Sequence, residues 1–435
     1  MTATVRREGA YRWYVTAVLA LVLAFNVMDR HLIALLQEQI KAELLLDDLQ
    51  LGLLTGLSFA VFYGTLALPL ARLADRHNRM RLLSMCLFLW SAMTMACGMA
   101  VGFVSLMLAR IGVGVGEAGG YPTSASVLSD YFPKERRGTA LAIFGLGAPL
   151  GASAGLFLGG YLSDLVGWRN TFLIIGLAGV LMAPLVLLTI REPKRGAGES
   201  HRAGVDLEAA PPPFLDTMKH LWRIRSIRYL FTANIFHGIV LYSYVAWSPS
   251  FYIRVFDVST TDVSVWLGLL SLGTAAGTSV GGVLYDWAGR RDIRWQLWLL
   301  ACNGVVLAPL LICQFLAPSL VASLAFAVVP AVLIQVFVGP TIALAQSLVQ
   351  PRIRAMTAAI SLFTLNVFGL GLGPTITGAL SDALGAHLAD PDAGLRYAVT
   401  AVLAVEFVAI GFYALGGRHL KRDSERDRAL DFASR

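Results

Sequence analysis

The chain has 435 residues, of which 56 % are hydrophobic and only 14 % are charged, and its mean hydropathy is +0.66. Ordinary soluble domains carry about 25 % charged residues, so this composition excludes a water-soluble protein and predicts an integral membrane protein. The apolar run after Arg12 lacks a small-residue cleavage site and is interrupted by Met28-Asp29-Arg30. We therefore expect a retained first membrane helix rather than a cleaved signal peptide.

Stretches that are long and apolar enough to cross a bilayer follow one another along the chain. They lie near 13–36, 51–73, 81–101, 103–129, 138–163, 169–190, 229–253, 262–286, 295–316, 319–348, 353–383 and 396–417. The twelve stretches predict an all-α membrane protein. The longest tract without one, residues 191–228, divides them into six and six.

This division predicts four parts: an N-terminal six-helix bundle (1–190), a cytoplasmic linker (191–228), a C-terminal six-helix bundle (229–417) and a cytoplasmic tail (418–435). With alternating topology, 29 of the 35 Lys and Arg residues fall on the side of both termini, and four fall on the other side. The positive-inside rule then places both termini and the linker in the cytoplasm. A net charge of +7 follows from this topology and from attraction to anionic lipid, so no nucleic-acid partner is expected.

The linker contains one amphipathic segment, which follows three consecutive prolines. Its apolar residues recur at helical spacing opposite two basic residues: Phe214, Leu215, Met218, Leu221 and Trp222 against Lys219 and Arg223. This pattern indicates a helix lying along the inner leaflet. A plain hinge between the two halves is the alternative reading, and both can hold.

Two loops in corresponding positions of the halves share a pattern of Asp at a helix end followed by Arg. They read "ARLADRHNRMR" (71–81) and "GGVLYDWAGRRDIR" (281–294). The first resembles the signature loop of the major facilitator superfamily, with Ala71 and Asn78 in place of two of its glycines. Further matches are "LARIGVGVGEAG" (108–119), "GLGAPLGASAGLFLGG" (145–160), "GWRNTF" (167–172) and "GLGPTITGALSD" (371–382), and the resemblance covers the whole chain.

Charged residues at the predicted cytoplasmic ends of the helices form a candidate gating cluster. They are Asp75, Arg76 and Arg79 in the first loop, Asp286 and Arg290 in its repeat, and Asp130 and Arg137 around the next cytoplasmic loop. We expect Asp130 and Arg137 to be the partners of Arg79 and Asp75. Such a cluster would hold the bundles in one state and release them in another, whereas ordinary solvated loop charges are the simpler reading.

Four charged residues lie inside predicted spans, where each costs about 2.5–3.5 kcal/mol at mid-bilayer. They are Asp29 and Arg30 in the first span and Arg110 and Glu117 in the fourth. Counted from the basic residues at the inner surface, Asp29 and Glu117 lie at about the same height, and Arg110 lies about two turns further out. We predict a cluster of two acids and two bases. A carboxylate there can exchange its cation for a proton or an anionic substrate, whereas a purely structural brace is the alternative.

The segments "NVMDR" and "ARIGVGVGEAGGYPTSASVLSDYFPKERRGTA" together resemble the Spinster family, and a bacterial Spinster homologue in particular. The resemblance implies alternating access and an amphiphilic substrate with an anionic head, such as a lysophospholipid or sphingosine-1-phosphate-like lipid. Proton coupling is associated with some members of that family, and Asp29, Arg30, Arg110 and Glu117 match its membrane-buried charges. We expect Asp29 and Glu117 to exchange protons, and the two arginines to tune those acids or hold the anionic head group. A proton-driven exporter of drug-like or other small organic anions is the alternative.

Other polar residues give weaker signals. His237 and Tyr242 in the seventh span are candidate substrate-binding residues, although a hydrogen-bonded packing role suits His237 as well, and Glu406 in the twelfth span looks isolated. No ATP-binding loop, catalytic motif or metal-ligand motif is found, so we expect neither an enzyme nor a bound cofactor or metal, with a proton as the coupling ion. A receptor or scaffold remains an alternative class. We expect a monomer in the bacterial inner membrane, surrounded by membrane lipids.

Overall fold

The computed structural model describes residues 3–196, 214–350 and 353–433, and within these ranges every regular element is a helix. Contacts divide the chain into two compact units, Met1–Asp206 with Val258–Leu269 and Leu207–Asp257 with Leu270–Arg435. The predicted linker falls partly on residues 197–213, which lie outside the described residues, as do residues 434–435 of the predicted tail.

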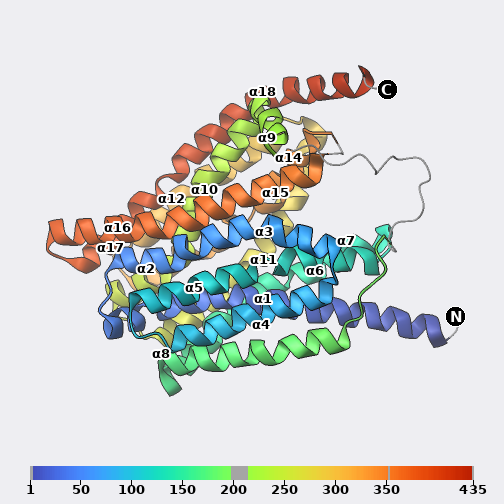
Figure 1. The fold of residues 1–435 in the computed structure, drawn as a ribbon. Coiled ribbons are helices and arrows are strands. Elements are labelled where there is room, and N and C mark those ends of the chain that lie inside the picture. The colour runs from blue at the N-terminus through green and yellow to red at the C-terminus, as the bar shows by residue number, and fades with distance from the viewer. Residues whose placement is uncertain (1–2, 197–213, 351–352, 434–435) are drawn as a thin grey trace. The chain divides into compact units, whose positions relative to one another are not determined.

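The first part of the chain forms nine helices (Figure 1). They are α1 (Ala3–Leu44), α2 (Asp48–Gly52), the π-helix η1 (Leu53–Leu57), α3 (Ser58–Arg76), α4 (Arg79–Gly98), α5 (Phe103–Glu117), α6 (Gly120–Tyr131), α7 (Lys134–Gly145) and α8 (Gly147–Thr189). Three successive elements, α2, η1 and α3, make one continuous span that begins at a capping box, in which Asp47 and Gln50 bond to each other's backbone N–H groups.

The second part follows the same plan. Its helices are α9 (Phe214–Arg223), α10 (Arg225–Phe256), α11 (Thr260–Arg291), α12 (Trp295–Leu316), α13 (Leu320–Leu333), α14 (Val338–Ser347), α15 (Arg354–Thr364), the π-helix η3 (Leu365–Leu370), α16 (Gly371–Leu388), α17 (Pro391–Leu403) and α18 (Glu406–Ala433). The amphipathic segment of the linker is the helix α9, with Leu221 buried and Trp222 exposed.

Eleven described stretches are long and apolar enough to cross a membrane, and one of them contains two spans. The stretch Lys134–Thr189 turns at Gly167, whose φ of 78° and ψ of 163° interrupt α8. Before this turn α8 runs along α1, so that a methyl group on Gly151 would lie 2.2 Å from the Ala24 carbonyl oxygen. After the turn α8 runs along α4 in the opposite direction. The predicted all-α fold with twelve membrane helices is therefore confirmed.

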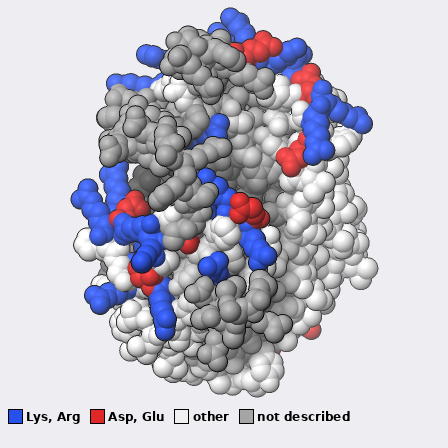
Figure 2. Space-filling view, turned by 90° about the vertical axis from the view of Figure 1, so that its right-hand side faces the viewer, with Lys and Arg blue, Asp and Glu red and all other residues white. Residues whose placement is uncertain are grey.

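The helices bury small and apolar residues between them and leave large apolar side chains on their outer faces. Leu181, Leu188, Val283 and Val321 are examples of such exposed side chains. In the view of Figure 2, Lys and Arg gather on the face turned towards the reader, whereas the flank at the lower right carries almost no charge. An apolar flank of this kind is what a lipid environment requires, because hydrocarbon cannot solvate charge.

Several spans are interrupted along their length, and two of these interruptions bear on the contacts described below. The fourth span is interrupted between α5 and α6, and the tenth span is interrupted between α13 and α14. At such breaks the run of regular helical hydrogen bonds is interrupted, which can leave main-chain carbonyl groups for side chains of other helices. Both breaks matter below, since each lies against a polar side chain of another span.

Candidate functional site

An ion pair joins the first span to the break in the fourth. Arg30 of α1 donates from Nε and Nη2 to the same oxygen of Glu117, Oε2, at 3.0 and 2.8 Å. Glu117 is the last residue of α5, and Arg30 Nη2 also donates to Asn26 Oδ1, one turn earlier on α1, at 3.3 Å. Charge-assisted bonds of this type are roughly twice as strong as neutral ones, so the pair ties the two spans together.

Aromatic rings support the guanidinium groups. The central carbon of the Arg30 guanidinium lies 4.7 Å from the ring centroid of Phe59 and 4.6 Å from that of Tyr63, and these two rings stack on each other. Arg110 lies 5.2 Å from the same Phe59 ring. The face of an aromatic ring is the negative part of its quadrupole, so it attracts a cation. The rings thereby partly replace the water that burial removes from both arginines.

The four charged residues differ in how far they are buried. Glu117, Arg110 and Asp29 are 0 %, 2 % and 3 % exposed, whereas the side chain of Arg30 is 19 % exposed. Glu117 Oε1 is buried and has no hydrogen-bond partner within the described part of the chain. Arg30 is therefore the most exposed member of the cluster, and its partner carboxylate has one oxygen without a described hydrogen bond.

Asp29 and Arg110 belong to the same region but have other partners. Thr94 of α4 donates to Asp29 Oδ2 at 2.9 Å, and Arg110 Nε donates to the Leu54 carbonyl oxygen of η1 at 3.3 Å. π-Helical turns often occur at functional sites, where they expose a carbonyl to a ligand or side chain. The predicted cluster thus extends over four spans, and the ion pair within it joins Arg30 to Glu117.

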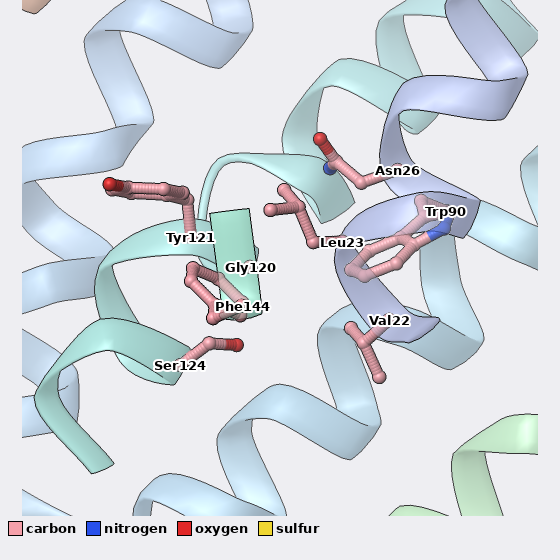
Figure 3. Close-up of a pocket in the computed structure, with 8 residues that line it drawn as sticks. All are labelled: Val22, Leu23, Asn26, Trp90, Gly120, Tyr121, Ser124 and Phe144. Atoms are coloured by element: carbon pink, nitrogen blue, oxygen red, sulfur yellow. The ribbon is translucent and has the colours of Figure 1, made fainter. Parts of the chain in front are cut away.

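A narrow cleft lies beside this cluster, between α1, α4 and the start of α6 (Figure 3). It is too narrow to hold a water molecule in this conformation, and it is lined by Val22, Leu23, Asn26, Trp90, Gly120, Tyr121, Ser124 and Phe144. Asn26 Nδ2 is buried there without a hydrogen-bond partner among the described residues. Pockets for drug-sized ligands measure roughly 300–1,000 Å³, so the cleft must widen before it can hold either a small solute or a lipid.

The candidate gating cluster is centred on Arg79, at the start of α4. Arg79 Nη1 donates to Asp130 Oδ2 at 2.5 Å, and Nε donates to Glu192 Oε1 at 2.6 Å. Further bonds from its two Nη atoms reach Ser126 Oγ and the Pro193 carbonyl oxygen. The structure thus brings Arg79 and Asp130 together, and it adds Glu192, which follows α8.

The remaining residues predicted for this cluster are placed differently. Arg137 donates to the Ser129 carbonyl oxygen at 2.8 Å and is not joined to Asp75. The exposed members are Asp75, Arg76, Asp286 and Arg290. Asp75 and Arg137 therefore form no pair in this conformation.

The two candidates in the seventh span are also separated from each other. His237 is buried against Glu406 of α18, at 2.8 Å from Nδ1 to Oε1, so Glu406 is not isolated as the sequence suggested. Tyr242 donates to Asn366 Oδ1 of η3 at 3.2 Å. Both belong to contacts between helices of the C-terminal unit.

Sequence reasoning missed several residues that shape the site. Thr94, Asn26, Phe59 and Tyr63 contact the charged cluster, but polar and aromatic residues of these types are common in membrane helices and carry no distinguishing pattern. One usable signal was present: Asn26 precedes Arg30 by four residues, the spacing that places two side chains on one helix face.

Comparisons with known proteins agree with this architecture. The sequence model described as "Major Facilitator Superfamily" matches residues 19–374. An "MFS-type efflux pump" of Mycolicibacterium smegmatis is 33 % identical over 96 % of this chain and 95 % of its own length. The "Hexuronate transporter" of Bacillus subtilis is 26 % identical over 83 % of this chain and 86 % of its own.

A solved structure gives a similar result. It is described as a bacterial homologue of the human lysosomal transporter Spinster in an inward-facing and unoccupied conformation. It aligns with a TM-score of 0.84 and 29 % identity, and the alignment covers 95 % of this chain and 98 % of that one. The resemblance to the Spinster family, noted from the charged segments of spans one and four, is confirmed by this likeness.

Proposed function

Because the chain belongs to the major facilitator superfamily, we propose that this multi-pass membrane transporter couples protons to the movement of an anionic amphiphile. The proposed substrate has one long tail and an anionic head, as in a lysophospholipid or a sphingosine-1-phosphate-like lipid. The energy source is an ion gradient used by alternating access of a central site. The resemblance to the Spinster family suggests this substrate class, and the likeness to a bacterial Spinster homologue supports that resemblance.

The observation that carries this proposal is the buried pair of Arg30 and Glu117. An anion that approaches Arg30 competes with Glu117 for the same guanidinium, and a displaced carboxylate would be a buried charge without a partner. A proton on Glu117 removes that charge. Binding of the anion and binding of the proton should therefore favour each other, which is the thermodynamic form of coupling.

The other two charges have supporting roles in this scheme. Asp29, held by Thr94, is proposed as a second proton site one residue from Arg30. Arg110, held by the Leu54 carbonyl and Phe59, is proposed to attract the anionic head towards the cluster. Its planar fork suits phosphate or carboxylate better than an ammonium group would.

The cluster at Arg79 is proposed as a device that holds one conformation. Its bonds join the start of α4, the end of α6 and the segment after α8, so they must change if these helix ends move apart. We propose that this end faces the cytoplasm, together with both termini, and that the membrane is the bacterial inner membrane. The distribution of Lys and Arg supports this orientation.

A small organic anion is the second candidate substrate. An efflux pump and a hexuronate transporter are among the relatives, which supports this candidate. Both candidates share an anionic group for Arg30. They differ in the rest of the molecule, because a lipid also needs an apolar path from the site for its tail.

Flux measurements separate the candidates. The full chain would first be screened by thermal shift with lysophosphatidylglycerol, sphingosine-1-phosphate, glucuronate and a set of anionic drugs. The best stabiliser would then be followed in proteoliposomes with and without a pH gradient. The proposal requires stabilisation by a single-tailed anionic lipid and faster flux under the gradient. Flux of glucuronate or anionic drugs alone would support the second candidate.

A further inference from the structure

The C-terminal unit buries a second pair of titratable side chains, away from the cluster of charges discussed above. His237 Nδ1 of α10 lies 2.8 and 2.9 Å from the two carboxylate oxygens of Glu406, the first residue of α18. His237 Nε2 lies 3.3 Å from the Ile334 carbonyl oxygen. Both side chains are 1 % exposed. The function proposed above makes no use of this pair.

The number of protons in this pair follows from its hydrogen bonds. Both ring nitrogens of His237 face oxygen atoms, and a neutral imidazole has only one N–H group. Both contacts are hydrogen bonds only if the imidazole carries two protons, or if Glu406 is protonated and donates to Nδ1 while Nε2–H donates to Ile334. In either arrangement the pair holds one proton more than a neutral histidine beside an ionised glutamate.

Loss of that proton has a defined structural consequence. The remaining N–H would stay with the carboxylate, because a charged acceptor binds it more strongly than a carbonyl does. Nε2 would then face the Ile334 carbonyl with a lone pair and could not donate to it. The bond from α10 to Ile334 therefore depends on the proton, whereas the bond from α10 to Glu406 does not.

Ile334 lies where the helix of the tenth span is interrupted. It follows α13 and lies in the four-residue break before α14, and the ring of Phe337 in the same break is 4.0 Å from the imidazole. Glu406 also adjoins a break, since α17 ends at Leu403 and α18 begins at Glu406. The imidazole thus bridges irregular backbone in the tenth span and the start of a helix in the twelfth.

The same relationship occurs in the N-terminal half. There Arg30 of the first span lies against Glu117, at the break in the fourth span. In the C-terminal half a basic side chain of the seventh span lies against the break in the tenth. In both halves a basic side chain thus lies against a break, although its acid partner belongs to the fourth span in one half and to the twelfth span in the other.

Tyr413 of α18 is a further titratable group in the described surroundings of the pair. It donates to Asn234 Oδ1 of α10 at 2.9 Å, and a tyrosine hydroxyl keeps its proton across the physiological range. On the side of α12, Gly304 leaves space for the carboxylate, since a methyl group there would lie 3.2 Å from Glu406 Oε1. The other face is closed by the apolar ring of Phe337.

We propose that His237 and Glu406 form a proton-binding site in the C-terminal unit, whose proton ties the seventh span to the break in the tenth. With the proton bound, α10 holds the segment between α13 and α14 through Ile334. Without it, that segment is released from α10 while the contact between α10 and α18 persists. The site makes the mobility of the tenth span depend on pH.

The proton can be observed directly by ¹⁵N NMR of the full chain in nanodiscs, with ring-labelled histidine and the His237 signals assigned by their loss in His237→Gln. Near neutral pH the proposal requires a protonated Nε2, with Nδ1 either protonated as well or accepting a proton from Glu406. A neutral ring protonated only at Nδ1 at pH 6 would overturn it.

The consequence for the tenth span can be measured by hydrogen exchange of peptides covering residues 334–341, corrected for the intrinsic effect of pH. Protection in the wild type should fall by roughly fivefold as pH rises, the factor that one net hydrogen bond supplies. In Glu406→Gln the amide can donate to Nδ1, so the Ile334 bond no longer needs a titratable proton and protection should be independent of pH.

Tyr413→Phe is the matched control, because it removes another buried hydrogen bond between α10 and α18 but leaves the proton site intact. It should keep the pH response of the wild type. An equal pH response in Glu406→Gln and in the wild type would overturn the proposal, as would a response that Tyr413→Phe abolishes.

Discussion

Arg30 donates both of its bonds with Glu117 to a single carboxylate oxygen, Oε2, and leaves Oε1 buried without a hydrogen-bond partner in the described part of the chain. A carboxylate in a stable bidentate pair normally engages both oxygens. This one-sided arrangement leaves a place on Oε1 where a proton can bind without displacing the guanidinium first. This arrangement supports the proposal that Glu117 exchanges its cation for a proton.

Glu117→Gln should separate transport from the pH gradient. The amide is similar in size to the protonated acid but cannot release a proton, so flux should respond to substrate concentration alone. Gradient-driven uptake into proteoliposomes should fall by roughly tenfold or more, equivalent to about 1.4 kcal/mol of lost coupling. Asp29→Asn is expected to have the same kind of effect through the second proposed proton site.

The control for these variants is Glu43→Gln, because Glu43 is a partly exposed member of an ion pair with Arg169 at the end of α1. Its flux should keep the pH dependence of the wild type. Wild-type coupling in both Glu117→Gln and Asp29→Asn would show that the buried charges only brace the helices.

Arg30→Ala should destabilise the protein more than the double variant Arg30→Ala/Glu117→Gln. The single change leaves the Glu117 carboxylate buried without its cation, a loss of about 3–5 kcal/mol, whereas the double change removes both charges. Melting temperatures are measured for the wild type, for each single variant, Arg30→Ala and Glu117→Gln, and for the double variant. Together they form a double-mutant cycle that gives the coupling between the two residues. If Arg30 were paired mainly with Asp29, stability would instead be restored in the double variant Arg30→Ala/Asp29→Asn, and this result would contradict the pairing with Glu117.

Arg79→Lys should shift the protein towards the conformation in which the helix ends around Arg79 are apart. Lysine cannot reproduce the planar fork that reaches Asp130, Glu192, Ser126 and the Pro193 carbonyl together. Spin-label distances between α4 and α6 should lengthen or broaden. Arg76→Lys is the control, since Arg76 is exposed, and an equal shift in both variants would contradict a specific role of Arg79.

The orientation proposed for the chain predicts opposite labelling of two glycine positions. Gly138 and Gly102 both have open space where a side-chain carbon would lie, so a cysteine fits at either. In a variant whose four cysteines are replaced, a membrane-impermeant maleimide should label Gly102→Cys in intact cells. It should label Gly138→Cys only after the membrane is opened. Labelling of Gly138→Cys in intact cells would contradict the proposed orientation.

Much of the architecture is predictable because hydrophobic length and the distribution of Lys and Arg are strong signals in a membrane chain. Counting residues from the inner surface also placed Asp29 and Glu117 at one height, and the ion pair between Arg30 and Glu117 agrees with that estimate. The turn at Gly167 likewise falls between two predicted stretches, 138–163 and 169–190.

The choice of partners could not be predicted. Adjacent residues on a helix point in different directions, so Asp29 faces Thr94 on α4 whereas Arg30 faces α3 and α5. The pair of His237 and Glu406 is separated by 169 residues and depends on how the seventh and twelfth spans pack. Helix rotation of this kind is fixed by close packing, and hydrophobic periodicity alone does not define it.

The most direct test of the central claim is the affinity for lysophosphatidylglycerol at pH 5.5 and pH 8, because its single phosphodiester charge does not change over this range. If a proton on Glu117 makes Arg30 available to the anion, the wild type should bind roughly tenfold more tightly at pH 5.5 than at pH 8. Glu117→Gln should bind with one affinity at both pH values. An unchanged pH dependence in Glu117→Gln would contradict the coupling proposed for this pair.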